Sequence, residues 1–320
     1  MTNLHNALLG ALGTDICELL AQPDTTDVML NADGRVWVDG TKHGRIPTNI
    51  RVEPEPMDQV LRLVAHHTGT VITRERPILR ATLQITGERI EATIPPVTEA
   101  PTFAIRKPPR TIFALDNFTP RQNVPSPRNG LTTANDPLAF LRQAVTARKN
   151  ILIAGSTGSG KTSLLSSLMQ EPGIVQDRVL VLEDTREIAI SSPDHVAMLS
   201  SDDVSLRTLV RTAMRYRPDR IIVGEVSDGK AALQMVRALN TGHAGSLCTV
   251  HANSAADAME RLIDLCSEET VNAPRRAIAT GIHVVVFVSR MPDQTRAICE
   301  IVTIQPGTHL GYEAHTVWGR

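Results

Sequence analysis

The sequence predicts a two-domain protein in which a smaller α+β domain precedes an α/β domain with a mainly parallel sheet. The length of 320 residues exceeds a typical domain of ~100–200 residues. From residue 150 onward, apolar strand-like runs alternate with helical stretches, as in a parallel sheet covered by helices. The strands expected there are 151–154, 179–182, 221–223, 247–251 and 284–288.

The first part of the chain carries mixed strand and helix signals. Two short apolar runs, 28–30 and 36–38, flank an Asn-Ala-Asp-Gly turn, which is typical of a hairpin loop. Apolar residues then recur at helical spacing from Met57 to His67, so one face of that helix is hydrophobic. Further strands are expected at 79–85, 89–94 and 102–106.

A stretch rich in Pro, Asn, Ser and Arg separates the two parts, and its prolines block regular structure. Asp136 and Pro137 then suit a helix start, with Asp as the N-cap and Pro at the first helical position. The predicted boundaries are 1–107 for the N-terminal domain, 108–135 for the linker and 136–320 for the second domain.

Composition excludes several classes of protein. Hydrophobic residues make up 42% and charged residues 21%, which is ordinary globular usage. The formal net charge of −1 argues against direct nucleic-acid binding by the whole surface. No apolar run approaches the ~20 residues that span a bilayer, and residues 1–20 resemble an amphipathic helix rather than a secretory signal. We therefore expect a cytoplasmic protein.

The clearest motif is GSTGSGKT at 155–162, which matches G-x-x-x-x-G-K-[ST] between an expected strand and an expected helix. Such a loop turns backbone N–H groups toward phosphate at the positive end of a helix. Lys161 would bridge the β- and γ-phosphates of ATP, and Thr162 would bind Mg²⁺. The expected nucleotide-binding residues are Gly155, Ser156, Thr157, Gly158, Ser159, Gly160, Lys161 and Thr162.

Three expected strands end in residues suited to phosphate chemistry. Strand 179–182 leads into Glu183, strand 221–223 leads through a glycine into Glu225, and strand 247–251 ends at His251. Ligands bind at the carboxyl ends of strands in open α/β sheets. One acid can hold Mg²⁺ while the other orients or deprotonates water, and the residues leave that choice open. His251 could donate a hydrogen bond to the γ-phosphate.

Two groups of arginines complete the set of candidates. Arg207, Arg211 and Arg215 share one helix face and repel one another unless anions face them. Those anions could be carboxylates of an adjacent subunit, a nucleotide phosphate or solvent counterions. Arg89 and Arg106 lie in expected strands just before the linker and could close over the nucleotide.

Four motifs in this order resemble the traffic ATPases of type IV secretion, and the TrbB-like proteins of conjugal DNA transfer most of all. They are GSTGSGKT (155–162), LEDTREI (182–188), RPDRIIVGE (217–225) and TGHAGSLCTVHANS (241–254). The stretches VMLNADGRVWVD (28–39), GERIEATIPPV (87–97) and AIRKP (104–108) are similar to the N-terminal domain of the same family. Ser227 stands where the family commonly has arginine.

The resemblance implies a hexameric ring of subunits with a RecA-like P-loop ATPase domain, peripheral on the cytoplasmic face of the inner membrane. Its implied partners are inner-membrane secretion-channel ATPases and the coupling protein. Lys161 and Thr162 correspond to the Walker A pair, and Glu183 corresponds to the acid of the Asp box. Glu225 corresponds to the Walker B acid, a Mg²⁺ ligand with Thr162, and His251 to the His-box residue. Arg89 and Arg106 correspond to arginines near the γ-phosphate.

We therefore expect an ATPase that uses Mg²⁺-ATP to move its two domains and so drive conjugal DNA transfer or pilus assembly. The alternatives are a DNA translocase or helicase, an ATPase of a related pilus or type II secretion system, and an inactive scaffold. Near-neutral charge disfavours the translocase. Four scattered cysteines without a CxxC pair disfavour the zinc module of the general secretion relatives. Intact Lys161, Glu183 and Glu225 argue against a scaffold.

Overall fold

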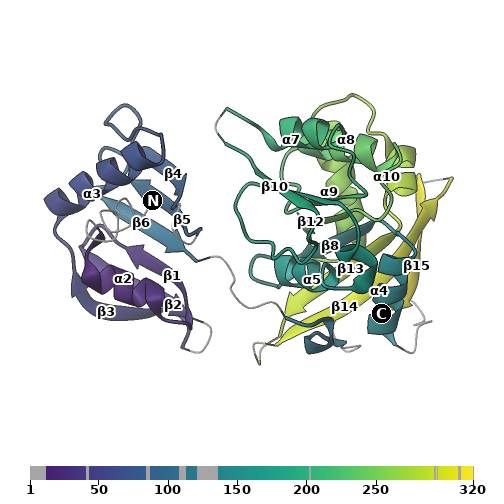
Figure 1. Ribbon diagram of the computed structural model, residues 1–320, viewed down its shortest axis with the longest axis horizontal. Coiled ribbons are helices and arrows are strands. Elements are labelled where there is room, and N and C mark those ends of the chain that lie inside the picture. Colours follow the sequence, from purple (N-terminus) through teal and green to yellow (C-terminus); the bar gives the residue numbers. More distant parts are fainter. Residues whose placement is uncertain are drawn as a thin grey trace. The chain divides into compact units, whose positions relative to one another are not determined.

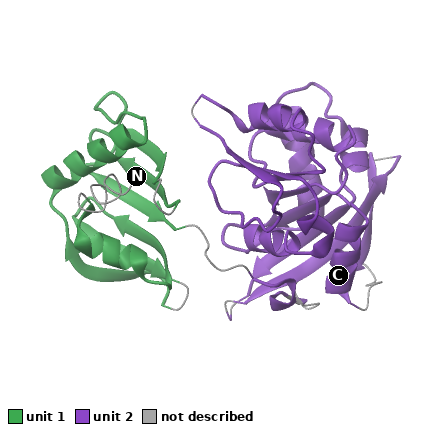
Figure 2. Ribbon diagram, viewed as in Figure 1, with its two compact units in different colours: residues 1–110 green, residues 111–320 purple. Residues whose placement is uncertain are grey.

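The chain divides into two units, residues 1–110 and residues 111–320 (Figures 1 and 2). The computed structural model describes residues 12–40, 43–83, 87–107, 113–120, 136–201, 203–291, 293, 295–308 and 311–319. Most of the predicted linker and the first half of the predicted N-terminal amphipathic helix lie outside the described residues. No helix within the described ranges is both long and apolar enough to cross a membrane.

Unit 1 is built on an antiparallel sheet of six strands in the order β3-β2-β1-β6-β5-β4 (Figure 1). Its strands are β1 (Thr25–Leu30), β2 (Arg35–Gly40), β3 (Ile46–Arg51), β4 (Ile78–Thr82), β5 (Arg89–Thr93) and β6 (Thr102–Arg106). The predicted hairpin joins β1 to β2, and Gly34 in its turn has a φ of 78°. Strand β3 was not predicted, because its sequence IPTNIR has little apolar alternation.

Two helices pack their apolar faces on this sheet. They are α2 (Thr14–Ala21) and α3 (Pro54–His67). In α3, Met57, Leu61 and Val64 are buried with Val28 and Ile105 of the strands in one hydrophobic core. The helix predicted over 57–67 is therefore confirmed. Its apolar residues recur at helical spacing because only one face of the helix is buried.

Unit 2 is built on a nine-stranded sheet whose main path runs β10-β9-β11-β12-β8-β13-β14-β15. The strands are β7 (Thr119–Pro120), β8 (Ile151–Gly155), β9 (Val179–Glu183), β10 (His195–Leu199), β11 (Arg220–Val223), β12 (Leu247–His251), β13 (Val284–Arg290), β14 (Arg296–Pro306) and β15 (Tyr312–Trp318). Pairing is parallel from β10 to β13 and antiparallel between β13, β14 and β15. The predicted fold class is confirmed, and the antiparallel extension adds to it.

Helices cover both faces of this sheet (Figure 1). The helices are α4 (Pro137–Thr146), α5 (Lys161–Leu168), α6 (Pro172–Val175), α7 (Leu206–Ala213), α8 (Gly229–Leu239), α9 (Ala255–Ser267) and α10 (Arg275–Gly281). Alternate residues of β8 enter different cores: Leu152 and Ala154 pack with α7 to α10, whereas Ile151 and Ile153 pack with α4 to α6. This two-sided burial explains why the parallel strands are continuous apolar runs.

The start of unit 2 lies within the predicted linker. Residues 113–120 include the 3-10 helix η1 (Leu115–Asn117) and β7, which pairs with β14. Leu115 and Phe118 are buried in the core beside α4 and α5. These two apolar side chains attach the segment to unit 2, although prolines surround it. Helix α4 then starts as predicted, because Asp136 Oδ1 accepts hydrogen bonds from the N–H groups of Leu138 and Ala139.

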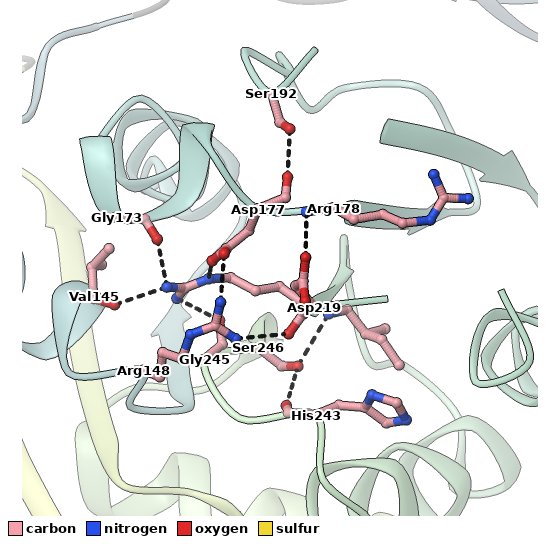
Figure 3. A network of polar contacts seen from close by, with 12 residues as sticks. Val145, Arg148, Gly173, Asp177, Arg178, Ser192, Asp219, His243, Gly245 and Ser246 are labelled. Carbon is pink, nitrogen blue, oxygen red and sulfur yellow. Dashed lines mark hydrogen bonds and ion pairs between the residues drawn. The ribbon is translucent and has the colours of Figure 1, made fainter. Parts of the chain in front are cut away.

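A network of polar contacts joins several segments at the edge where the parallel strands begin, and Asp177, Gly173 and Gly245 belong to it (Figure 3). Arg220, the first residue of β11, is 1% exposed. Its Nε donates to Asp177 at 2.6 Å, and its Nη atoms donate to the carbonyls of Val145, Gly173 and Gly245. The guanidinium thus connects β11 to the end of α4, to α6 and to the loop before β12. Burial lowers the pKa of Arg220, and Asp177 opposes that shift.

We predict that Arg220→Met destabilises unit 2 by about 3–5 kcal/mol, because it leaves Asp177 and three carbonyls without their main donor. Arg148→Met is the control, since Arg148 also pairs with Asp177 but is 43% exposed, and its loss should be worth less than about 1 kcal/mol. Urea unfolding measures both changes. Equal, small changes in the two variants would contradict a structural role for Arg220.

Candidate active site

The phosphate-binding motif forms a loop between β8 and α5, as the sequence predicts. A Cβ on Gly155 would lie 2.3 Å from Ser159 Oγ and 2.5 Å from the carbonyl oxygen of Val288, so a side chain has no room there. Gly158 and Gly160 have φ angles of 74° and 103°, which favour glycine. The glycines therefore permit the tight turn that exposes backbone N–H groups above α5.

The ammonium of Lys161 is buried inside this loop. Lys161 is 6% exposed, and its Nζ donates to the carbonyls of Gly155 at 3.0 Å and Ser156 at 3.1 Å. Burial lowers the pKa of Lys161, while Glu225 and Glu187 raise it. The lysine is thus held over the loop as a positive charge with acids nearby but no carboxylate bonded to it among the described residues.

His251 connects Lys161 to Glu225. Its Nδ1 lies 3.1 Å from Lys161 Nζ, and its Nε2 lies 3.2 Å from Glu225 Oε2. Because an ammonium only donates, Nδ1 accepts from it and Nε2 carries the proton that faces Glu225. Three residues predicted from separate motifs therefore meet in one row of close polar contacts. They lie at the ends of β12 and β11 and at the end of the loop after β8.

A fourth residue, Glu187, was not among the predicted site residues. Its Oε2 accepts a hydrogen bond from Thr162 Oγ1 at 3.3 Å. Glu187 lies in the LEDTREI motif, but it follows the expected strand by several residues, and only strand ends were selected from the sequence. A second acid four positions after Glu183 in a short loop is the signal that could have found it.

Glu183 is buried and bonded to the backbone of the loop that follows β9. It is 3% exposed, and its Oε1 accepts 2.8 Å hydrogen bonds from the backbone N–H groups of Glu187 and Ile188. Burial raises the pKa of Glu183 to about 7, and the two N–H groups act in the opposite direction. Its carboxyl therefore holds the loop that carries Glu187, whereas Glu187 is the acid beside Thr162.

The loop residues fit a phosphate ligand with Mg²⁺. Ser159 Oγ is buried without a hydrogen-bond partner among the described residues, and the Lys161 ammonium donates to two loop carbonyls and lies 3.1 Å from His251 Nδ1. Thr162 Oγ1 and Glu187 Oε2 are hard oxygen atoms, the type that Mg²⁺ prefers. The described residues contain no cluster of three or more His, Cys, Asp or Glu side chains that could hold a metal ion. A Mg²⁺ here would take its other ligands from water and phosphate oxygens.

The two predicted arginines of unit 1 lie opposite each other on neighbouring strands. Arg89 of β5 is the register partner of Arg106 of β6. Their side chains are 44% and 55% exposed, with Glu91 at 3.8 Å from Arg89 and Asp27 at 3.7 Å from Arg106. Like charges directly opposite one another in a sheet repel. Each arginine of this exposed pair thus has one ion pair within unit 1.

The three arginines predicted on one helix face lie on α7 and its C-terminal turn. Arg207, Arg211 and Arg215 are exposed, and Leu206, Leu209 and Val210 are buried on the other side. Across the described parts of the chain, no carboxylate lies within ion-pair distance of these three arginines. The anion that the sequence leads us to expect opposite this face thus does not come from the described residues.

We predict that Glu183→Gln changes the pH dependence of stability. A carboxyl with a raised folded-state pKa supports folding most below its unfolded pKa of about 4.3, and this support is lost as pH rises to about 7. Relative to the native chain, the variant should therefore gain stability as pH rises through this window, by on the order of 1–3 kcal/mol between pH 5 and pH 8. Thermal or urea unfolding at pH 5 and pH 8 measures the difference. Asp184→Asn, at an exposed neighbour, is the control, and a pH-independent difference for Glu183→Gln would contradict the argument.

Comparison with known proteins identifies the family of the chain. Residues 114–313 match the family described as type II/IV secretion system protein. The chain is 34% identical to a probable conjugal transfer protein TrbB of Sinorhizobium fredii, covering 97% of this chain and 92% of that protein. It is 33% identical to the type IV secretion system protein VirB11 of Bartonella quintana, covering 79% of each. The solved Legionella pneumophila ATPase DotB has a TM-score of 0.64 at 20% identity, covering 92% of this chain and 81% of that chain, and shares the fold. The chain thus belongs to the type II/IV secretion system protein family, among its TrbB- and VirB11-like type IV secretion ATPases.

Proposed function

We propose that this protein hydrolyses Mg²⁺-ATP as a hexameric motor that powers a type IV secretion machine for conjugal DNA transfer or its pilus assembly. The observation that carries the proposal is the convergence of Lys161, His251 and Glu225 beside the Thr162–Glu187 pair. These groups come from the loop after β8 and from the carboxyl ends of β9, β11 and β12. The similarity to a conjugal transfer protein TrbB supports the choice of conjugation.

The residues divide the work of phosphoryl transfer between them. Backbone N–H groups of 155–162 and the ammonium of Lys161 bind the phosphates, and they keep that geometry before and after the reaction. Thr162 and an acid would hold Mg²⁺, which would supply positive charge to the phosphate groups. Of the predicted acids, Glu225 has its carboxylate in the row with His251, where it can orient a water molecule.

The acid that holds the metal is then a choice between Glu225, as the sequence predicts, and Glu187. The 3.3 Å contact with Thr162 favours Glu187. Glu183 supports the site by holding the loop of Glu187. When a γ-phosphate is bound, Lys161 would donate to it instead of to His251. His251 would then be free to change its contact with Glu225, and in this way it can couple the γ-phosphate to Glu225.

Arg89 and Arg106 are proposed to contact the γ-phosphate of their own or a neighbouring subunit. The proposal is supported by their positions on the strands. Both side chains are exposed and lie opposite each other as like charges, so an anion between them would relieve the repulsion that their ion pairs with Glu91 and Asp27 leave. Arginine is suited to this role because its planar fork of donors matches a phosphate group.

The experiment that tests the proposal is ATP hydrolysis measured together with oligomer mass, in the presence and absence of DNA. We expect Mg²⁺-dependent hydrolysis by a hexamer, without the strong stimulation by DNA that a translocase shows. Loss of Mg²⁺ should stop turnover. Hydrolysis only with DNA would favour a translocase, and ATP binding without hydrolysis would favour a scaffold.

Within that assay, Glu225→Gln should keep ATP bound but slow hydrolysis strongly, because the carboxylate that orients water is lost while the phosphate contacts remain. Lys161→Ala is the matched control, and it should lose nucleotide binding while the chain stays folded. Equilibrium binding and steady-state kcat separate the two effects. If Glu225→Gln loses affinity and keeps kcat, Glu225 serves binding alone.

We predict that Arg106→Ala lowers kcat by roughly 10³-fold or more, as for other arginines that contact a transferred phosphoryl group, with ADP affinity nearly unchanged. ADP has no γ-phosphate to lose. Mixing Arg106→Ala with Lys161→Ala subunits should restore activity if a neighbouring subunit supplies the arginine. A kcat within error of the native value, or equal weakening of ADP and ATP, would show that Arg106 is a surface residue.

A further inference from the structure

The phosphate-binding loop has a second cationic group on the side away from its acids. In the sheet, β8 lies between β12 and β13, and β14 follows β13. His251 and Glu225 are on the β12 side. On the other side, Arg296 begins β14 and reaches the loop, because a Cβ on Gly160 would lie 2.6 Å from Arg296 Cδ and 3.2 Å from its Nε.

The guanidinium of Arg296 is held in place by packing. It stacks over the ring of Phe113 with its Cζ 4.9 Å from the ring centroid. The methylene stem crosses above Gly160, so the side chain is fixed between the start of unit 2 and the phosphate-binding loop. A cation over an aromatic ring is attracted to the ring face, but the ring supplies no negative charge.

Arg296 has no anion beside it within the described chain. No carboxylate of the described ranges lies within ion-pair distance of Arg296, and its direct partner across the β13–β14 hairpin is another arginine, Arg290. Burial lowers the pKa of Arg296, and the charge of Arg290 adds to that effect. Two arginines directly opposite each other repel. This half-buried charge is therefore incomplete without an anionic ligand.

The direction in which a nucleotide lies across the loop indicates which of its phosphates would be beside Arg296. The γ-phosphate belongs near Glu225, Glu187 and His251, on the β12 side of the loop. A triphosphate that crosses the loop from that side brings its α-phosphate and nucleoside to the β13–β14 side. We propose that Arg296 is a nucleotide-binding residue that contacts the phosphate next to the nucleoside, which ATP and ADP share.

This inference rests on the proposed ATPase function, but it predicts a different experimental result. Arg296→Gln should weaken ADP and a non-hydrolysable ATP analogue by the same factor, about tenfold or more, since a hydrogen bond to a charged group is worth ~1.5–3 kcal/mol. Saturating kcat should change little. Arg106→Ala, in contrast, should act on kcat and spare ADP.

The two substitutions of Arg296 are chosen to keep its methylene groups packed over Gly160. Glutamine retains methylene groups over Gly160, and Arg296→Lys retains both the stem and the charge, so we expect lysine to recover most of the affinity. Arg276→Ala, at an exposed arginine of α10, is the control for loss of one positive charge. Melting temperatures establish that each variant is folded.

The outcomes separate the possible failures. Equal loss of ADP and ATP affinity in Arg296→Gln, recovered by lysine and absent in Arg276→Ala, supports the contact. Unchanged affinities in a folded Arg296→Gln overturn it, as does a loss for ATP alone. A loss that lysine does not recover, with altered preference between ADP and GDP, would mean base stacking and also overturns it. If the native chain itself binds no nucleotide, the proposed function fails instead.

Discussion

The buried ammonium of Lys161 is the charge around which the site is arranged. A cation removed from water is unfavourable unless polar groups surround it. Here two loop carbonyls and His251 supply acceptors, while Glu225 and Glu187 supply negative charge without bonding to it. Because these partners are neutral or more distant, the ammonium stays available to an anion. A phosphate that enters the loop can take its donors and release His251 toward Glu225.

Charged groups differ between the two ends of the parallel strands in unit 2. Where the strands begin, Arg220 donates hydrogen bonds to the segments around it, including Asp177 and the carbonyl of Gly245. Where they end, polar groups remain incomplete: Ser159 Oγ has no partner within the described residues, and Arg290 faces Arg296. A satisfied buried network makes a structure rigid, whereas an unsatisfied buried polar group can be completed by a water molecule, an ion or a ligand. The network at the start of the strands thus helps to fix the positions of the polar groups at their ends.

The strand order also gives the site a direction. Acids and His251 lie on the β12 side of the phosphate-binding loop, and Arg296 lies on the β14 side. In the proposed function, chemistry at the γ-phosphate and binding of the rest of the nucleotide would therefore depend on different strands. Such a division would allow affinity and turnover to be changed separately.

Local patterns in the sequence by themselves determined the helix and strand periods, the loop at 155–162, the helix start at Asp136 and the strand ends that carry Glu225 and His251. These features depend on neighbours within one turn or one strand, so spacing reveals them. Only the tertiary structure decided that Glu183 holds a loop while Glu187 faces Thr162, since the direction of a carboxylate depends on how the chain turns back. The same is true of Arg220 and Arg296, whose partners come from segments far apart in the chain. Their burial follows from packing between those segments, which no local pattern of residues can show.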